Sequence, residues 1–320
     1  MKDGNKDGIS RQPGAVPVIL FIHRRIWHLR QVLRPIRAYR PRRLFVFADG
    51  WKKGDTGEEA LCREARDLVR RGVDWPCRLV MSCSSRRLGL KTSVERGLRR
   101  VFREVSQAVI LEDDCVAQAG FFDFCEEGLR KFALDRTVMS ISGSCFVAPG
   151  IPIPAPSFLS RYPHCWGWAT WRRAWRQYRG RLGHGELLAA VRRQDFSGRE
   201  RFHWERVAGQ MSRRELSSWA YFWMWTHWRM EGLALTPAVN LVRNIGFDST
   251  ARHTRELAAP LRVRAGRRSR QKGLSTLSAG ESRELDRSVF QNHFWLMAGR
   301  RGWLDKIRSA LRRWWADRNR

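Results

Sequence analysis

Three acidic residues, Glu112, Asp113 and Asp114, directly follow an apolar run, residues 108–111. Adjacent like charges repel by about 1 kcal/mol in water, and by more where solvent is excluded. A divalent cation that also holds a diphosphate needs a few such hard oxygen ligands. Acids after a strand also serve as caps and dipole partners for a following helix, here the segment 121–129. From spacing alone, the metal site and the helix cap remain alternatives.

Apolar runs rich in β-branched residues alternate with amphipathic segments through the first part of the chain. Such runs predict buried strands, and the segments between them predict helices. The alternation indicates a mainly parallel α/β sheet, Rossmann-like, with helices on both faces. The expected strands are 16–24, 42–50, 77–83 and 107–114, and the expected helices are 27–39, 58–71 and 92–105.

Polar residues follow these expected strands where the strands end. Arg24 ends the first strand, Asp49 lies near the end of the second, and the acidic triplet ends the fourth. Ligands of such sheets bind beyond the carboxyl ends of the strands. The sequence therefore predicts one site at this edge that contains all of these side chains.

The composition indicates a globular, strongly basic protein. The chain has 320 residues, 43% of them apolar, with 16 Trp and a formal net charge of +30. The arginines are spread along the whole length, which favours a solvated basic surface. A basic surface also attracts phosphate-bearing partners, whether nucleic acid, nucleotide or anionic membrane.

The cysteines and the hydropathy pattern point to a cytoplasmic location. The seven cysteines form no Cys-x-x-Cys pair, and their odd number argues against a disulfide framework. The first residues lack the apolar segment of a signal peptide, and no run approaches the ~18 apolar residues of a membrane span. We expect a protein of the cytoplasm.

Aromatic residues gather in two blocks, 165–178 and 219–228. Tryptophans at helical spacing usually pack in a core, and Trp171 and Trp175 are expected to do so. In the sequence Trp-Gly-Trp at 166–168, the glycine leaves backbone room between two indoles that can stack on sugar rings. A lone histidine such as His253 is more often an ordinary buried residue than a metal ligand.

Taken together, these motifs resemble those of a known group of enzymes. Their order resembles that of the bacterial nucleotide-diphospho-sugar transferases of the GT-A fold, often labelled hemolytic-protein-like and similar in layout to the N-acetylglucosaminyltransferase I type. The resemblance covers residues 16–254, and the pairing of LEDDC with WGWATW is specific. The motifs are PVILFIHRR, RRLFVFADG, DWPCRL, RLGLKTSVERGL, VILEDDC, FFDFCEEGL, ISGSCF, RYPHCWGWATWRRAW, PAVNLVRNIGF and RHT.

The resemblance implies a nucleotide site at the ends of the first two strands. Ile22, His23 and Arg24 would lie against the base and the diphosphate, with His23 at a position where the family usually has asparagine. Asp49 would bind the nucleoside. The family sequence Asn-Leu-Gly appears here as 87–89, beginning with Arg87.

The resemblance extends to the rest of the donor site. Lys91 would form with Arg87 a basic pair suited to the diphosphate. Trp166, Gly167 and Trp168 would wall the donor and acceptor pocket.

The resemblance also implies a metal site. Asp114 would be the direct ligand of Mn²⁺ or Mg²⁺, and Glu112 and Asp113 would face the sugar and the ribose. His253, in the sequence RHT, matches a family Thr-His-Thr element near the metal.

The catalytic base does not transfer from the family. Related enzymes place an acid beside the tryptophan of the second aromatic block, but here the sequence at 217–220 is Ser-Ser-Trp-Ala. An inverting transfer needs a base within hydrogen-bond reach of the acceptor hydroxyl. Glu205 and Glu215 are the carboxylates nearby in the sequence and are the predicted bases.

We therefore expect a metal-dependent, inverting glycosyltransferase of the hexosyltransferase type. It would move a sugar from a nucleotide-diphosphate donor, with UDP-sugar favoured, to a hydroxyl of a glycan or lipid-linked acceptor. Two alternatives stay open: a basic nucleic-acid-binding protein, and an inactive GT-A-fold protein that only binds. The nucleic-acid alternative leaves LEDDC unexplained, because without a metal these acids repel phosphate, so nucleic acid is not the expected partner.

The sequence divides into four parts. Residues 1–15 form a polar lead-in, 16–254 a GT-A-like transferase domain, 255–290 a polar basic linker, and 291–320 a basic amphipathic C-terminal helix. This last part carries eight Lys or Arg and two Asp, beside tryptophans suited to a membrane interface. We expect it to bind an anionic membrane peripherally, at the inner face, or to dock on the domain.

Overall fold

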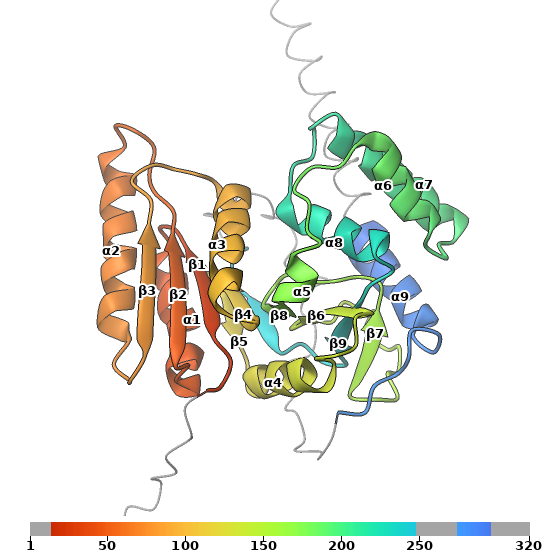
Figure 1. Ribbon diagram of the computed structural model, residues 1–320, viewed down its shortest axis with the longest axis horizontal. Coiled ribbons are helices and arrows are strands. Elements are labelled where there is room, and N and C mark those ends of the chain that lie inside the picture. The colour runs from red at the N-terminus through yellow and green to blue at the C-terminus, as the bar shows by residue number, and fades with distance from the viewer. Residues whose placement is uncertain (1–13, 248–273, 296–320) are drawn as a thin grey trace, which may run out of the picture.

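A computed structural model describes residues 14–247 and 274–295 (Figure 1). The strands are β1 (Val18–Ile22), β2 (Arg43–Ala48), β3 (Arg78–Cys83), β4 (Gln107–Glu112), β5 (Cys115–Ala117), β6 (Val138–Ser142), β7 (Ser157–Ser160), β8 (Trp168–Trp171), β9 (Leu233–Pro237) and β10 (Val242–Asn244). The helices are α1 (Ile26–Tyr39), α2 (Thr56–Gly72), α3 (Leu90–Glu104), α4 (Phe121–Lys131), α5 (Arg172–Trp175), α6 (His184–Arg192), α7 (Gly198–Ser212), α8 (Trp219–Arg229), α9 (Arg283–Val289) and a π-helical turn η1 (Phe290–Trp295).

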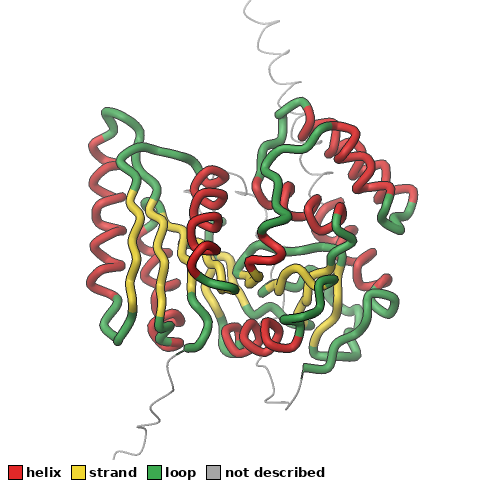
Figure 2. The backbone as a smooth tube through the Cα atoms, in the orientation of Figure 1, coloured by secondary structure: helices red, strands yellow, loops and turns green. Residues whose placement is uncertain are grey.

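One sheet crosses the molecule, with the strand order β3-β2-β1-β4-β8-β6-β9-β7 (Figure 2). The pairs β3/β2, β2/β1, β1/β4 and β6/β9 are parallel, whereas β4/β8, β8/β6 and β9/β7 are antiparallel. A second, two-stranded sheet pairs β10 with β5. The sheet is thus mainly parallel, and β8 runs against both of its neighbours near the centre.

Alternate residues of the central strands supply the two faces of this sheet. In β1, Val18, Leu20 and Ile22 join the cluster that also holds α1, α2 and α4, whereas Ile19 and Phe21 join the cluster of α3. Because strand side chains alternate between faces, one apolar run supplies both cores. The predicted fold class, an α/β sheet flanked by helices on both faces, is confirmed.

The second described range, residues 274–295, packs onto the first. Asp286 of α9 is buried and accepts hydrogen bonds from the Ser160 hydroxyl at 2.5 Å and from Arg161 Nε at 3.1 Å. Leu277 N donates to Ser157 O at 3.0 Å. Residues 274–290, which fell within the predicted linker, therefore contribute a helix and a strand-like contact to the domain.

The aromatic blocks form cores on both faces of the sheet. Trp171 and Trp175 are both buried, as expected, but they do not share one helix face. Trp171 lies in β8 and packs in the cluster of α1 and α4, whereas Trp175 lies in α5 and packs with Trp223 in the cluster of α3. The two tryptophans are four residues apart because β8 ends at Trp171 and α5 begins at the next residue.

Several predicted features lie in residues that the structure does not describe. Most of the lead-in, His253 and the amphipathic segment from Trp303 onward lie outside the described residues. Membrane binding by that segment stays a prediction. Within residues 14–247 and 274–295, none of the helices combines the length and the apolar character that crossing a bilayer requires.

One buried histidine predicts how acid affects stability. His227 of α8 is fully buried, with Nε2 at 2.8 Å from Ser140 Oγ and Nδ1 at 3.0 Å from Trp223 O. Burial lowers the pKa of His227 to about 4. Because the pKa of His227 is lower in the folded state than in the unfolded state, the neutral ring contributes to the free energy of unfolding. This contribution is fully present above the unfolded-state pKa of about 6.5 and is lost as the pH falls toward 4.

We expect His227→Leu to change the slope of this pH dependence. At pH 7.5 the variant should be less stable, because Ser140 and Trp223 lose their buried partner. Between pH 6 and 4.5 it should lose up to about 1.4 kcal/mol per pH unit less than the wild type, which is the contribution of one proton. Urea unfolding across this range measures both slopes, and parallel curves would contradict the assignment.

Candidate functional site

Polar side chains from three neighbouring strands meet at the carboxyl edge of the sheet. β1 is parallel to β2 on one side and to β4 on the other, and Ile22 lies beside Ala48 in the register. The residues that follow these strands are therefore brought together, as the sequence predicted. We call this group the carboxylate–arginine site: Arg24, Arg25, Asp49, Glu58, Arg87, Glu112, Asp113 and Asp114.

The acidic triplet is held by Arg25, the residue before α1. Arg25 Nη1 donates to Asp114 Oδ2 and lies 3.6 Å from Asp113 Oδ1. Asp113 is 7% exposed, and its Oδ2 accepts a hydrogen bond from His23 N at 2.9 Å. One guanidinium is thus shared by two adjacent carboxylates.

The triplet carries more negative charge than this contact balances. Burial, followed by the charge of Asp114, raises the pKa of Asp113 to about 7, against the opposing effect of Arg25. Burial and the two neighbouring aspartates also raise the pKa of Glu112 well above its usual value. An added cation would stabilise the ionised forms of both groups.

β10 brings the sequence NIGF to the triplet. Ile245 N donates to Asp114 O at 2.9 Å, and His28 Nε2 lies 3.0 Å from Ile245 O. A Cβ atom on Gly246 would lie 2.2 Å from Asp114 Oδ2 and 3.1 Å from Arg25 Nη1. The glycine therefore lets the backbone approach the Asp114 carboxylate.

The tip of β1 is fixed by its histidine. His23 Nε2 lies 3.0 Å from Gly50 O, so the side chain joins the end of β1 to the end of β2. Burial lowers the pKa of His23, which favours the neutral ring. Ile22 contributes its side chain to the core, and its carbonyl accepts from Asp49 N at 3.0 Å.

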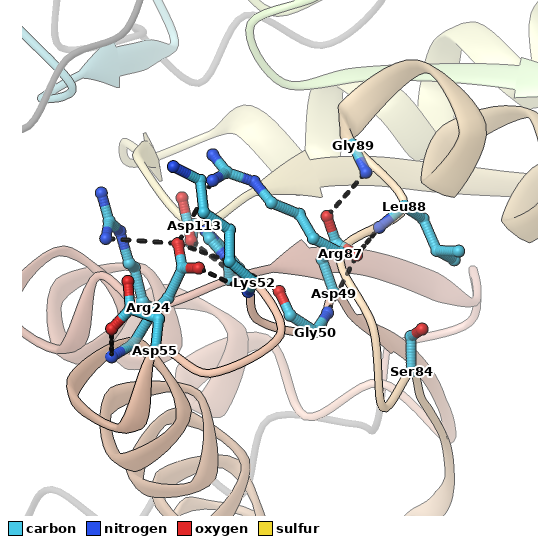
Figure 3. Close-up of polar contacts among 12 residues, drawn as sticks. Arg24, Asp49, Gly50, Lys52, Asp55, Ser84, Arg87, Leu88, Gly89 and Asp113 are labelled. Carbon is cyan, nitrogen blue, oxygen red and sulfur yellow. Dashed lines mark hydrogen bonds and ion pairs between the residues drawn. The ribbon is translucent and has the colours of Figure 1, made fainter.

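Asp49 anchors the loop between β3 and α3 (Figure 3). Its Oδ1 accepts from Gly50 N at 2.9 Å and from Leu88 N at 2.7 Å, and its Oδ2 accepts from Gly89 N at 3.0 Å. Gly89, with φ of 83°, is the N-cap of α3. The carboxylate therefore sets the position of residues 87–89, the predicted nucleotide-binding sequence.

A buried glutamate holds two partly exposed arginines of the site. Glu58, in the first turn of α2, is 3% exposed, and its Oε1 lies 3.2 Å from Arg24 Nη1 and 3.5 Å from Arg87 Nη1. Its Oε2 accepts from Lys52 N at 2.8 Å. Arg24 and Arg87 are thereby oriented while their side chains stay 40% and 22% exposed.

The Trp-Gly-Trp sequence is divided between the surface and the core. Trp168 is 1% exposed and stacks on Trp219 with ring centroids 5.6 Å apart. Trp166 is partly buried and packs edge-to-face against Phe146 and Phe247. Of the two indoles, Trp166 is the one that keeps accessible surface for a ligand.

The backbone conformation and close packing at position 167 require a glycine. Its φ is 63°, and a Cβ atom would lie 2.5 Å from Val242 Cγ2. Gly167 O accepts from Gly143 N at 2.8 Å. The backbone of this turn is therefore packed directly against β10, the strand that precedes Ile245 and Gly246.

The remaining predicted residues lie away from the triplet. Lys91 Nζ donates to Gly180 O at 2.7 Å and lies 4.1 Å from the Phe222 ring centroid. Glu205 lies partly buried in α7. Glu215 is exposed and accepts from Arg213 Nε at 2.7 Å, a contact that lowers the pKa of Glu215. No described contact joins these three side chains to the triplet.

The oxygen donors of the triplet could contribute to a site for a divalent cation. Within the described residues, no group of three or more His, Cys, Asp and Glu side chains is arranged to hold a metal ion. Magnesium sites that also bind phosphate use one or two carboxylates and complete the shell with phosphate and water oxygens. Asp113 and Asp114 supply that number of hard oxygen donors, and the shared guanidinium shows that positive charge is held there. The residues therefore fit a divalent cation of this kind.

Sequence reasoning missed two residues of the site, Arg25 and Glu58, and the neighbouring Gly246. Arg25 stands beside Arg24 and has no distinguishing pattern. Glu58 follows Asp55, whose carboxylate accepts from Glu58 N at 2.8 Å, so it looks like an ordinary residue of a helix N-terminus. Gly246 gives no signal of its close approach to Asp114.

Comparison with known proteins gives structural likenesses alone. No family model and no curated protein matches the sequence. A mannosyltransferase from Pyrobaculum calidifontis in complex with GDP-Man and Mn²⁺ is similar over 57% of this chain and 53% of its own, with 15% identity and a TM-score of 0.35. This chain thus spans about half the length of that enzyme.

Two further solved structures are similar in the same sense. A 4-diphosphocytidyl-2C-methyl-D-erythritol synthase from Anaerococcus prevotii matches over 61% of this chain and 84% of its own, with 10% identity and a TM-score of 0.32. HddC from Yersinia pseudotuberculosis matches over 49% and 77%, with 9% identity and a TM-score of 0.27.

Proposed function

We propose that the protein is a metal-dependent GT-A glycosyltransferase that uses a nucleotide-diphospho-sugar donor, with UDP-sugar favoured. The observation that carries this proposal is the acidic triplet at the end of a central strand, partly balanced by Arg25. It lies on the same edge as two partly exposed arginines, Arg24 and Arg87, and the loop anchored by Asp49. Carboxylates for a cation next to guanidiniums for phosphate are the groups that a nucleotide diphosphate requires.

Different residues would contact different parts of the nucleotide-sugar donor. The loop 87–89 and the tip of β1 border the place of the nucleoside, and Arg24 and Arg87 carry the positive charge for the diphosphate. Asp113 and Asp114 would hold the metal, with Glu112 beside the sugar and ribose. When bound, the metal neutralises the charge that develops on the departing diphosphate.

The transfer itself exchanges one carbon–oxygen bond for another. The acceptor hydroxyl oxygen attacks the anomeric carbon, the bond to the diphosphate oxygen breaks, and its electron pair leaves with the diphosphate. The hydroxyl proton passes to a carboxylate base. Glu205 and Glu215 remain the proposed bases, and Trp166 offers an accessible ring for a sugar face.

The acceptor is proposed to be a glycan or a lipid-linked glycan. A lipid-linked acceptor would require contact with the membrane surface, which the basic segment 291–320 would provide on the cytoplasmic side. Most of that segment lies outside the described residues. Its role is part of the proposal.

Thermal-shift measurements test the donor assignment. UDP, GDP, TDP and CMP are each added with and without Mn²⁺ to the full-length protein. We expect one nucleoside diphosphate to raise Tm in the presence of Mn²⁺ and much less without it. A ligand at 100 times its Kd stabilises the folded state by about 2.7 kcal/mol, which is easily detected. No shift with any nucleotide in Mn²⁺ would refute the proposed function.

A further inference from the structure

A cavity of about 470 Å³ lies where α3, α7 and α8 come together, and we call it the α3–α8 cavity. Its walls come from the start of α3, the turn before α6, the end of α7 and the first part of α8. This volume is in the usual range of small-molecule sites. The lining residues are Lys91, 180–184, Met211, Ser212, Arg214, Leu216, Ser217 and Phe222.

The cavity is positively charged. Lys91, Arg181 and Arg214 line it, and no Asp or Glu is among the described lining residues. Lys91 Nζ lies 4.0 Å from Glu95 Oε1, so the unpaired positive charge comes from the two arginines. Across the described parts of the chain, Arg181 and Arg214 have no ion pair, whereas the adjacent Arg213 is paired with Glu215. Unpaired guanidiniums at a concave surface favour an anionic ligand that can accept two hydrogen bonds from one arginine.

Arg214 stands in a backbone conformation that disfavours it. Its φ is 62°, at the end of α7, and its N donates to Met211 O at 3.1 Å, while Leu216 N donates to Gln210 O at 3.3 Å. Glycine is the usual residue at such a helix end. A side chain in the left-handed region costs about 1–2 kcal/mol. A strained arginine that lines a cavity is consistent with a binding role for its side chain.

The start of α3 connects the cavity to the carboxylate–arginine site. Gly89 N is bonded to Asp49 in the carboxylate–arginine site, and Lys91, two residues later, lines the cavity. Leu182, Met211, Leu216 and Phe222 give it an apolar side on which a sugar ring can lie.

We propose that the α3–α8 cavity binds the acceptor, and that the acceptor is an acidic sugar whose phosphate or carboxylate contacts Lys91, Arg181 and Arg214. The identification as an acceptor rests on the proposed function. The anion site itself rests on the charges and shape of the cavity.

Calorimetric titration of the full-length protein, without nucleotide, tests the site. The probes are glucose 1-phosphate, glucuronate and glucose. We expect at least one acidic sugar to bind at least about 10-fold more tightly than glucose. Binding of glucose 1-phosphate alone identifies phosphate as the group, binding of glucuronate alone identifies carboxylate, and each supports the proposal. Equal binding of all three, or of none, overturns it.

Matched variants locate the binding. Arg181→Gln should weaken the acidic sugar at least about 5-fold, whereas Arg201→Gln, which removes the same charge from the exposed face of α7, should not. Arg214→Gly should weaken binding similarly while leaving Tm unchanged or raised, because the strain is removed. Equal effects of Arg181→Gln and Arg201→Gln would overturn the site.

The same preparation is titrated with nucleoside diphosphate in Mn²⁺. If this nucleotide fails to bind while acidic sugars bind with the expected variant pattern, the transferase function fails and the anion site stands. If the nucleotide binds and the acidic sugars do not, this inference alone fails.

Discussion

Replacing Asp114 by alanine is expected to abolish Mn²⁺-dependent binding of UDP, with a loss of at least about 100-fold in affinity. Even residues that only orient metal ligands contribute roughly 10- to 100-fold. Asp114 is the triplet member that Arg25 contacts most closely, and β10 approaches it directly. Calorimetric titration of UDP in Mn²⁺ measures the change.

The fold should survive this substitution. Burial raises the pKa of Asp113 and Glu112 most, and repulsion by Asp114 adds to this effect. Removing Asp114 relieves that repulsion, and Arg25 keeps Asp113 as a neighbour. Asp67→Ala is the matched control, because it removes one carboxylate from a half-exposed ion pair with Arg70 in α2. UDP binding by Asp114→Ala at the affinity of the wild type would show that the metal assignment is wrong.

The second large effect is expected from Gly167→Ala, which should lower the free energy of unfolding by about 2–5 kcal/mol. The left-handed φ of 63° accounts for about 1–2 kcal/mol of this loss. The new methyl group would also lie 2.5 Å from Val242 Cγ2 and 3.2 Å from Leu111 Cδ2, and overpacking of this kind costs about 1–3 kcal/mol.

Gly185→Ala is the control for this measurement. Gly185 lies in α6, and a Cβ atom there meets no atom within 4 Å. Alanine favours a helix by up to about 1 kcal/mol over glycine, so this variant should be equally stable or more stable. Urea unfolding compares the three proteins, and a Gly167→Ala stability within about 0.5 kcal/mol of the wild type would contradict the packing argument.

The first half of the fold was predictable because each element has a local signal. The run Val16 to Arg24 predicted a strand, and β1 spans Val18–Ile22; the segment 27–39 predicted a helix, and α1 spans Ile26–Tyr39. Buried parallel strands are almost wholly apolar, and amphipathic helices between them are easy to recognise.

The second half was harder to predict because its elements are short and aromatic throughout. β8 has only four residues, and all of them are buried, so neither a strand nor a helix period is visible. The seven successive buried positions of α8 after Tyr221 likewise hide its helical period. The packing of α9 depends on the contact of Asp286 with Arg161, 125 residues away, which no local pattern encodes.

The site was predictable as far as strand ends determine it. Arg24, Asp49 and the triplet follow adjacent parallel strands, so their approach follows from the alternation of strands and helices. The role of Glu58 was not predictable, because a burial of 97% depends on how α2 packs against the ends of β1 and β2. The position of Lys91 in a separate cavity depends equally on contacts with Gly180 and Phe222.

The strand β4 has a mechanical consequence for any ligand that binds at its end. It is hydrogen-bonded to β1 on one side and, through the register from Gln107/Trp171 to Ile110/Trp168, to β8 on the other. The strands on the β1 side of the sheet and those on the β8 side are therefore joined by a continuous ladder of backbone hydrogen bonds, and β4 is not a hinge between them. Rotation of one half over a ligand would break that ladder, so shielding of a bound substrate from water must come from movement of helices and loops above the sheet.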